Sequence, residues 1–224
     1  MTTRAVLFDL GNTLVHYYSG TAFRPILRQC LMQTAALAGT AVTESLFEQA
    51  LLLNREDPTF AVRPLANRVR ALFPEAEHIG MDALSREFMA PIFACARVDT
   101  SAHEVLDKLH SYRIKTAIVS NTPCGSPAEL WREELRRHGL LERVETAVFC
   151  VDAGWRKPHP APFRLALERL GVSPQEAIFV GDDPRWDVEG AKRAGIRPVL
   201  ISPGESTERP PTAIRHLESV LSLV

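Results

Sequence analysis

Residues 5–14 have the sequence AVLFDLGNTL. The four apolar residues Ala5–Phe8 form a short run of the length and composition typical of a buried strand, and Asp9 follows them directly. Ligands bind beyond the carboxyl ends of the strands in an open parallel sheet, so Asp9 stands where a functional group is expected. Aspartate is also a common turn residue, and Asp9 alone does not decide between the two interpretations.

Comparable apolar runs recur along the chain, and from the second onward they alternate with segments of helical character. They span residues 114–119, 146–151, 177–180 and 198–201. This alternation predicts an α/β fold in which a parallel sheet carries helices on both faces. A loop rich in proline, at residues 203–211, separates the last of these runs from a final expected helix.

Residues from about 20 to 96 follow a different pattern, because their apolar positions have helical spacing and include no convincing strand. A second helical face begins at Leu46, and two more helices are expected over 61–73 and 81–95. The first face, at the i, i+3, i+4, i+7 and i+8 positions, consists of Phe23, Ile26, Leu27, Cys30 and Leu31. We therefore predict a core of residues 1–15 and 97–224, with residues 16–96 inserted as a four-helix domain.

Composition excludes several classes of function. The 224 residues include 26 Lys and Arg against 27 Asp and Glu, so the positive charge expected of a nucleic-acid-binding protein is missing. The apolar stretch at the N-terminus ends at Asp9 and is too short for a signal peptide or a membrane span, which favours a cytoplasmic protein. The four cysteines are scattered without a C-x-x-C pair, so we expect reduced thiols and no zinc site.

Polar residues follow the later predicted strands as Asp9 follows the first. Ser120 and Asn121 end the second core strand, and Asp182, Asp183 and Asp187 follow the fourth. Between them lies Lys157, one of only four lysines, directly before Pro158.

Each of these residues has an ordinary interpretation when taken alone. Asp183 precedes Pro184 and suits a helix N-cap, Ser120 and Asn121 suit loop hydrogen bonds, and Lys157 suits a solvated charge. Their occurrence together, in order, at the ends of successive predicted strands indicates one site.

Together these residues resemble the four motifs of the haloacid dehalogenase-like hydrolase superfamily. Those motifs are a nucleophilic Asp after the first strand, a Ser or Thr after the second, a Lys, and an acidic pair after the fourth. The resemblance extends over nearly the whole chain, and residues 16–96 fall where members with a first-position cap carry four helices. It implies a Rossmann-like parallel-sheet core with an inserted four-helix cap domain. We predict hinges near 15–20 and 96–101, because two chain crossings there would let the cap open and close.

The resemblance also implies a chemistry. Asp9 would attack phosphorus to form an aspartyl-phosphate that water then hydrolyses, since a carboxylate is already ionised at neutral pH. The implied catalytic residues are Asp9, Ser120 and Lys157, and the implied substrate-binding residues are Ser120, Asn121 and Lys157. The implied Mg²⁺ ligands are Asp9, the carbonyl of Gly11, Asp182 and Asp187.

One position departs from the family's phosphatases, which usually carry a second Asp two residues after the nucleophile as general acid and base. Gly11 occupies that position here. Acid–base help contributes about 10²–10⁴-fold to the rate, so we expect a slow phosphatase, a good leaving group or a substitute proton carrier. His16 is the nearest candidate substitute, and a polar residue facing water is an equally good interpretation of it.

Three functions remain open on these residues. A Mg²⁺-dependent phosphatase acting on a small phosphorylated metabolite is favoured over a 2-haloacid dehalogenase, whose motif usually has an aromatic residue at the Gly11 position and which needs no metal. A binding or regulatory protein that has lost turnover is the third. Phosphonate cleavage would need a cap lysine, and residues 16–96 contain none.

The sequence says little about which substrate is chosen or about the oligomeric state. The candidate substrate-selecting residues Arg24, Arg55 and Arg63 are equally well interpreted as solvated helix faces. We expect no nucleic-acid or membrane partner, and a homodimer is compatible with the sequence.

Overall fold

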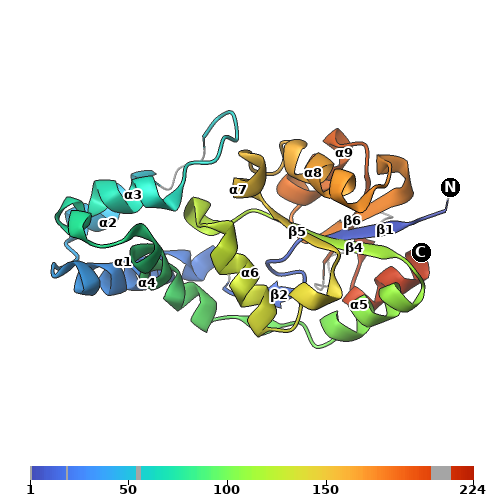
Figure 1. The fold of residues 1–224 in the computed structure, drawn as a ribbon, viewed down its shortest axis with the longest axis horizontal. Helices are drawn as coiled ribbons and strands as arrows, with labels where there is room; N and C mark the ends of the chain where they lie inside the picture. Colours follow the sequence, from blue (N-terminus) through green and yellow to red (C-terminus); the bar gives the residue numbers. More distant parts are fainter. Residues whose placement is uncertain (1, 19, 54–56, 203–212) are drawn as a thin grey trace.

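The protein, described as a computed structural model over residues 2–18, 20–53, 57–202 and 213–224, is built around a six-stranded sheet (Figure 1). The strand order is β5-β4-β1-β6-β7-β8, and neighbouring strands run parallel. The strands are β1 (Ala5–Phe8), β4 (Lys115–Ser120), β5 (Thr146–Phe149), β6 (Ala177–Gly181), β7 (Arg197–Ile201) and β8 (Ala213–Ile214). The predicted α/β parallel sheet is confirmed.

Strand β1 lies where the order of the sheet reverses, because the chain continues to β4 on one side and to β6 on the other. Phe8 pairs with Ile118 of β4 and with Val180 of β6. The residues that follow these three therefore leave the sheet at the same edge, which is the edge where parallel α/β sheets bind ligands.

Helices cover both faces of the sheet, as the alternation of apolar runs predicts. One face, with Leu7 and Val119, packs on α8 (Ala161–Leu170) and α9 (Glu189–Arg193). The opposite face, with Phe8 and Ile118, packs on α5 (Ala102–Ser111), α6 (Ala128–Arg137) and the 3-10 helix η7 (Leu217–Leu223). Smaller elements are α7 (Cys150–Ala153), the 3-10 turns η3 (Pro123–Gly125), η4 (Leu141–Arg143) and η5 (Pro174–Glu176), and the π-helical turn η6 (Pro184–Val188).

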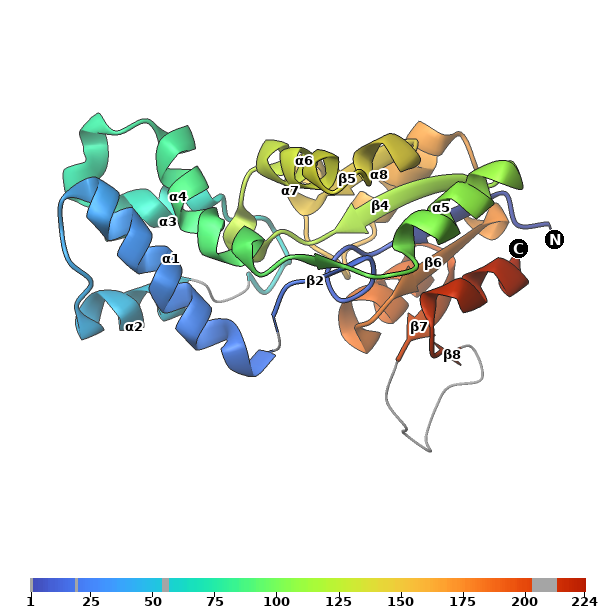
Figure 2. The same cartoon turned by 90° about the horizontal axis from the view of Figure 1, so that it is seen from below.

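The four helices predicted between the first and second core strands are present. They gather beyond the carboxyl edge of the sheet, at the end of the molecule opposite the two chain termini (Figures 1 and 2). Ile26, Leu27, Cys30 and Leu31 form the buried face of the first, as their spacing predicts. These helices are α1 (Phe23–Ala38), α2 (Glu44–Leu53), α3 (Leu65–Leu72) and α4 (Met81–Ala94), with 3-10 turns η1 (Gly20–Ala22) and η2 (Pro74–His78).

The third predicted helix is shorter than expected, because the residues before Pro64 pair with the core instead. Val62 N donates to Gly154 O at 3.0 Å, and Arg156 N donates to Phe60 O at 2.8 Å, around an antiparallel bridge between Ala61 and Trp155. We call this contact between residues 60–62 and 154–156 the backbone junction. It places the segment between α2 and α3 against the chain that leads to Lys157.

A second small sheet, formed by β2 (Val15–His16) and β3 (Arg97–Val98), joins the two chain crossings. It was not predicted from the sequence, since two residues give no periodicity to detect. The predicted proline-rich loop at 203–211 lies outside the described residues, and the last expected helix is the 3-10 helix η7. Among the described helices, none combines the length and apolar character that crossing a membrane requires.

Candidate active site

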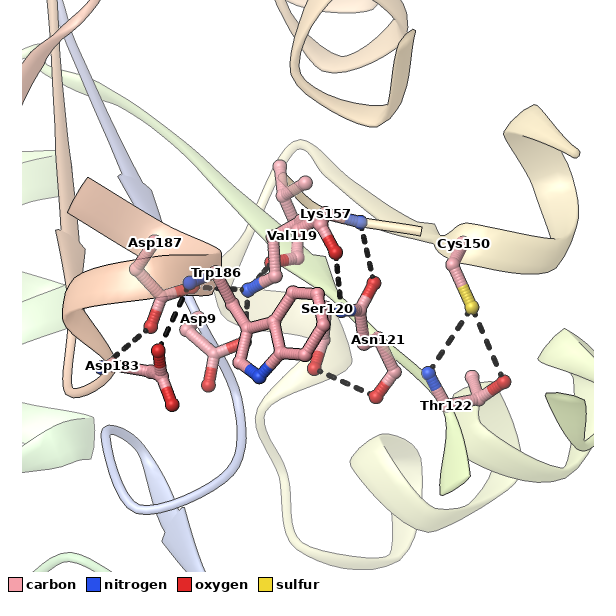
Figure 3. Close-up of polar contacts among 10 residues, drawn as sticks. All are labelled: Asp9, Val119, Ser120, Asn121, Thr122, Cys150, Lys157, Asp183, Trp186 and Asp187. Carbon is pink, nitrogen blue, oxygen red and sulfur yellow. Dashed lines mark hydrogen bonds and ion pairs between the residues drawn. The ribbon is translucent and has the colours of Figure 1, made fainter. Parts of the chain in front are cut away.

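Lys157 is the centre of the site and is almost completely buried. Its ammonium donates to Asp9 Oδ1 at 2.5 Å, to Asp187 Oδ1 at 2.6 Å and to the carbonyl of Val119 at 3.0 Å (Figure 3). Burial alone would disfavour the charged form, but the carboxylates of Asp187 and Asp9 outweigh it and raise the pKa of Lys157. The lysine is therefore a fixed positive charge between two carboxylates.

The side-chain amide of Asn121 holds the backbone of Lys157. Asn121 Oδ1 accepts from Lys157 N at 2.8 Å, and Asn121 Nδ2 donates to Lys157 O at 3.2 Å (Figure 3). The peptide bond that follows, between Lys157 and Pro158, is cis. Both polar ends of the Asn121 side chain are thus engaged within the protein, although the sequence suggested that this residue binds substrate.

Three carboxylates converge beside the lysine. Each of Asp9, Asp182 and Asp187 offers an oxygen, and these oxygens lie within 4.8 Å of one another. Burial raises the pKa of Asp187 to about 6 and that of Asp182 to about 6, and it raises the pKa of Asp9 despite the attraction of Lys157. One ammonium does not neutralise three clustered carboxylates. Their geometry and unmatched negative charge fit a divalent cation with oxygen ligands such as Mg²⁺.

The turn that carries Asp187 into the site begins at Asp183. Asp183 Oδ1 accepts from Arg185 N at 2.7 Å and from Trp186 N at 2.9 Å, which confirms its interpretation as a cap. Asp187 Oδ2 accepts from Asp183 N at 3.0 Å. Gly181 makes room for this arrangement, because a Cβ atom there would lie 2.4 Å from the Asp187 carboxyl. This role of Gly181 was not predicted from the sequence.

Ser120 ends β4 and is buried, as expected for a group that faces the site. Among the described residues, its hydroxyl makes one long contact, of 3.5 Å, to the carbonyl of Asn121. Together with Gly11, Ser120 lines a cavity of about 170 Å³, which we call the phosphoryl cavity. Tyr17 and Tyr18 also line it, and the Tyr17 hydroxyl is buried there without a hydrogen-bond partner in the described part of the chain.

His16, the proposed substitute proton carrier, faces away from this cavity. Its side chain is 51% exposed, and its Nε2 lies 3.4 Å from Asp99 Oδ2. The alternation of side chains along β2 and the residue after it places Val15 and Tyr17 on one side and His16 on the other. The water-facing interpretation of His16 agrees with the structure, and the same alternation would have pointed to Tyr17 had β2 been recognised.

Of the three arginines proposed to select substrate, Arg24 and Arg63 are each paired with a carboxylate. Arg24 pairs with Glu48 at 3.1 Å, and Arg63 pairs with Asp57 at 3.0 Å, both with exposed guanidinium groups. Arg55 lies outside the described residues. The structure brings two others, Arg68 and Arg156, to the vicinity of the site, and neither was predicted because the two lie far apart in the chain.

Comparison with known proteins agrees with this geometry. The family model of the haloacid dehalogenase-like hydrolases matches residues 3–195. A phosphoglycolate phosphatase from Rhodospirillum rubrum is 33% identical over 92% of this chain and 82% of its own length.

Solved structures give the same result. The crystal structure of a haloacid dehalogenase (HAD) phosphatase from Thermococcus onnurineus has a TM-score of 0.71 at 25% identity and covers 99% of this chain and 97% of that one. A 2-haloacid dehalogenase from Pseudomonas syringae also has a TM-score of 0.71 at 25% identity, covering 99% and 98%. With the sheet, the buried lysine and the acidic cluster in place, the chain belongs to the haloacid dehalogenase-like hydrolases.

Proposed function

We propose that the protein is a Mg²⁺-dependent phosphatase that hydrolyses a small phosphorylated metabolite through an aspartyl-phosphate on Asp9. The observation that carries this proposal is the buried Lys157 ammonium held between Asp9 and Asp187, with Asp182 beside them. A dehalogenase needs no metal and would have no use for three clustered carboxylates. The phosphatase name of the relative from Rhodospirillum rubrum supports the same choice.

Asp9 would act as the nucleophile. Lys157 holds its Oδ1, so the orientation of the carboxylate is fixed and Oδ2 is left to attack phosphorus. The new bond joins Oδ2 to phosphorus while the bond from phosphorus to the ester oxygen breaks, and the ester oxygen takes a proton from solvent and leaves as the alcohol. Water then attacks the same phosphorus, which releases inorganic phosphate and restores the carboxylate.

The remaining residues would position the phosphoryl group and neutralise its charge, which is most of what phosphoryl transfer requires of a protein. Ser120 would donate its hydroxyl to a phosphoryl oxygen, and Lys157 would supply fixed positive charge. Mg²⁺ held by Asp9, Asp182, Asp187 and the carbonyl of Gly11 would supply further charge neutralisation when bound. Asn121 would act through Lys157, whose backbone it holds.

The division into a core of residues 1–15 and 97–224 and a cap of residues 16–96 is part of this proposal. It is supported by the position of the four helices beyond the carboxyl edge of the sheet (Figure 2). A cap over Asp9 would exclude water during transfer to the carboxylate and admit it afterwards.

The test is hydrolysis of p-nitrophenyl phosphate by the purified protein with and without Mg²⁺, next to halide release from 2-chloropropionate. We expect phosphate release that depends on Mg²⁺ and on Asp9, with Asp9→Asn inactive because an amide cannot form the acyl-phosphate. Asp107→Asn, an exposed change on α5, serves as the matched control. Metal-independent halide release would assign a dehalogenase instead, and Asp9→Asn with normal phosphatase activity would overturn the assigned nucleophile.

A further inference from the structure

A second cavity, of about 230 Å³, lies next to the phosphoryl cavity. The two share Tyr18, Asn121 and Pro123 as common walls. A small molecule with its phosphoryl group beside Ser120 would therefore extend its other end into this second cavity. We call it the tail cavity.

The tail cavity is lined by two guanidinium groups from distant parts of the chain. Arg68 comes from α3, and Arg156 comes from the backbone junction, one residue before Lys157. Arg156 Nη1 donates to the carbonyl of Thr122 at 2.9 Å, which fixes the side chain. Its Nε is buried and has no hydrogen-bond partner within the residues that the structure describes. The hydrogen bond to Thr122 thus fixes the guanidinium group of Arg156 in the wall of the tail cavity.

Arg68 lies in the same electrostatic environment. Its Nε donates to the carbonyl of Arg63 at 3.3 Å. Burial lowers the pKa of Arg68, and the nearby positive charge of Arg156 lowers it further. Two half-buried guanidinium groups that repel each other across a cavity would both be stabilised by an anion between them.

The carboxylate of Asp57 also lines the tail cavity but does not fill this role. Its Oδ1 accepts from the backbone and hydroxyl of Thr59, and its Oδ2 accepts from Arg63 Nη2 at 3.0 Å. These bonds hold the pKa of Asp57 at about 2, so it is ionised and already paired. The charged residues described in the wall of the tail cavity therefore sum to a positive charge.

We propose that Arg68 and Arg156 bind a second oxyanion of the substrate, so that the enzyme acts on small phosphate esters whose alcohol carries a carboxylate or a second phosphate. This inference rests on the proposed phosphatase function. It excludes neutral and cationic alcohols as the preferred leaving groups. It also makes Arg68, rather than Arg24 or Arg63, the residue of the four-helix part that selects substrate.

The test measures inhibition constants against p-nitrophenyl phosphate, so that each compound is compared whether or not it turns over. Ethyl phosphate and phosphoglycolate form a nearly isosteric pair that differs by the carboxylate. 1,3-Propanediol bisphosphate offers a second phosphate, and phosphoethanolamine offers a cation. We expect phosphoglycolate or the bisphosphate to bind about 10- to 100-fold more tightly than ethyl phosphate, as charge-assisted hydrogen bonds allow, and phosphoethanolamine to bind no better than ethyl phosphate. The tighter of the two anionic compounds identifies the tail as carboxylate or phosphate.

Variants then assign the effect to the cavity. Arg68→Gln and Arg156→Gln should each remove most of the preference for the anionic compound, while the constant for ethyl phosphate changes less than about threefold. Arg70→Gln, an exposed change on the same helix, should leave the preference intact and so controls for general charge attraction. An unchanged constant for ethyl phosphate also shows that the variants are folded.

The test separates failure of the proposed phosphatase function from failure of the second oxyanion site. If p-nitrophenyl phosphate is not hydrolysed at all, the proposed function fails and this inference fails with it. If it is hydrolysed but phosphoglycolate and the bisphosphate bind no more tightly than ethyl phosphate, only the second oxyanion site is overturned. The same holds if Arg70→Gln lowers the preference as much as Arg68→Gln does.

Discussion

The amide of Asn121 binds both the N–H and the carbonyl of Lys157, at 2.8 and 3.2 Å, so a residue at the end of one strand fixes a lysine that lies 36 positions later in the chain. This relationship makes Asn121 a positioning residue. Its effect on catalysis would pass through the ammonium that Lys157 presents to Asp9 and Asp187.

Asn121→Ala is expected to lower kcat by about 10- to 100-fold and to leave KM nearly unchanged, because two hydrogen bonds to the lysine backbone are lost while the phosphoryl cavity keeps Ser120. Steady-state kinetics with p-nitrophenyl phosphate separates the two parameters. Asn67→Ala, an exposed change on α3, is the control. A rise in KM at constant kcat would instead restore the sequence-based interpretation that Asn121 binds substrate.

Lys157→Met is expected to destabilise the metal-free protein by about 3–5 kcal/mol at pH 7.5, because it leaves Asp9 and Asp187 buried without their cation. Both carboxylates then favour their protonated forms, so their pKa values rise further. Protonation relieves the repulsion, so the loss of stability should shrink as the pH is lowered to 5. Urea denaturation at the two pH values, with the exposed change Lys108→Met as control, measures this. A loss that grows at low pH would contradict it.

Asp182→Asn is expected to raise the melting temperature of the metal-free protein at pH 7.5 by a few degrees while abolishing stabilisation by Mg²⁺. The folded pKa of about 6 exceeds the ordinary value of 3.8, so the folded state holds this proton more tightly than the unfolded state does. Stability therefore falls as the pH rises through the window from about 4 to 6, and Asn avoids that loss.

The same titration predicts that wild-type protein binds Mg²⁺ more weakly as the pH falls below about 6, because the ion must displace protons from Asp182 and Asp187. Thermal shift with a Mg²⁺ titration at pH 5.5 and 7.5 reports both effects. Asp82→Asn, an exposed change on α4, should alter neither. Equal Mg²⁺ stabilisation of Asp182→Asn and wild type would remove Asp182 from the metal site.

Gly11→Asp is expected to raise turnover of alkyl phosphates by about tenfold or more and to change p-nitrophenyl phosphate little, because only the alkyl leaving group needs a proton. The site has room for the added side chain to begin, since a Cβ atom at Gly11 would meet nothing closer than Asp9 Oδ2 at 4.0 Å.

His16→Ala should leave turnover of both alkyl phosphates and p-nitrophenyl phosphate within twofold of wild type, as expected for an exposed residue paired with Asp99. A selective loss on alkyl phosphates in His16→Ala would return His16 to the mechanism.

Much of the fold could be predicted because its signals are local. The apolar run before Asp9, its repetition after each helical segment and the helical spacing in residues 23–31 are properties of short windows. The parallel sheet then dictates that residues following its strands meet at one edge, which is why Asp9, Ser120 and Asp182 come together.

What could not be predicted depends on contacts between distant segments. Asn121 gives no sign in the sequence that both ends of its amide bind Lys157. Arg68 and Arg156 are 88 positions apart and share a cavity only because the backbone junction brings their segments together. Gly181 resembles any strand-end glycine until the carboxyl of Asp187 is placed against it.

The backbone junction has a consequence for how substrate preference can diverge among related enzymes. Its two hydrogen bonds join main-chain atoms only, from Val62 to Gly154 and from Arg156 to Phe60. Mutations can therefore change the side chains on either side while residues 60–62 stay hydrogen-bonded to residues 154–156, provided that the backbone keeps its path. New specificities can arise by replacing residues such as Arg68 one at a time, while the geometry that aligns Asp9 and Lys157 is inherited unchanged.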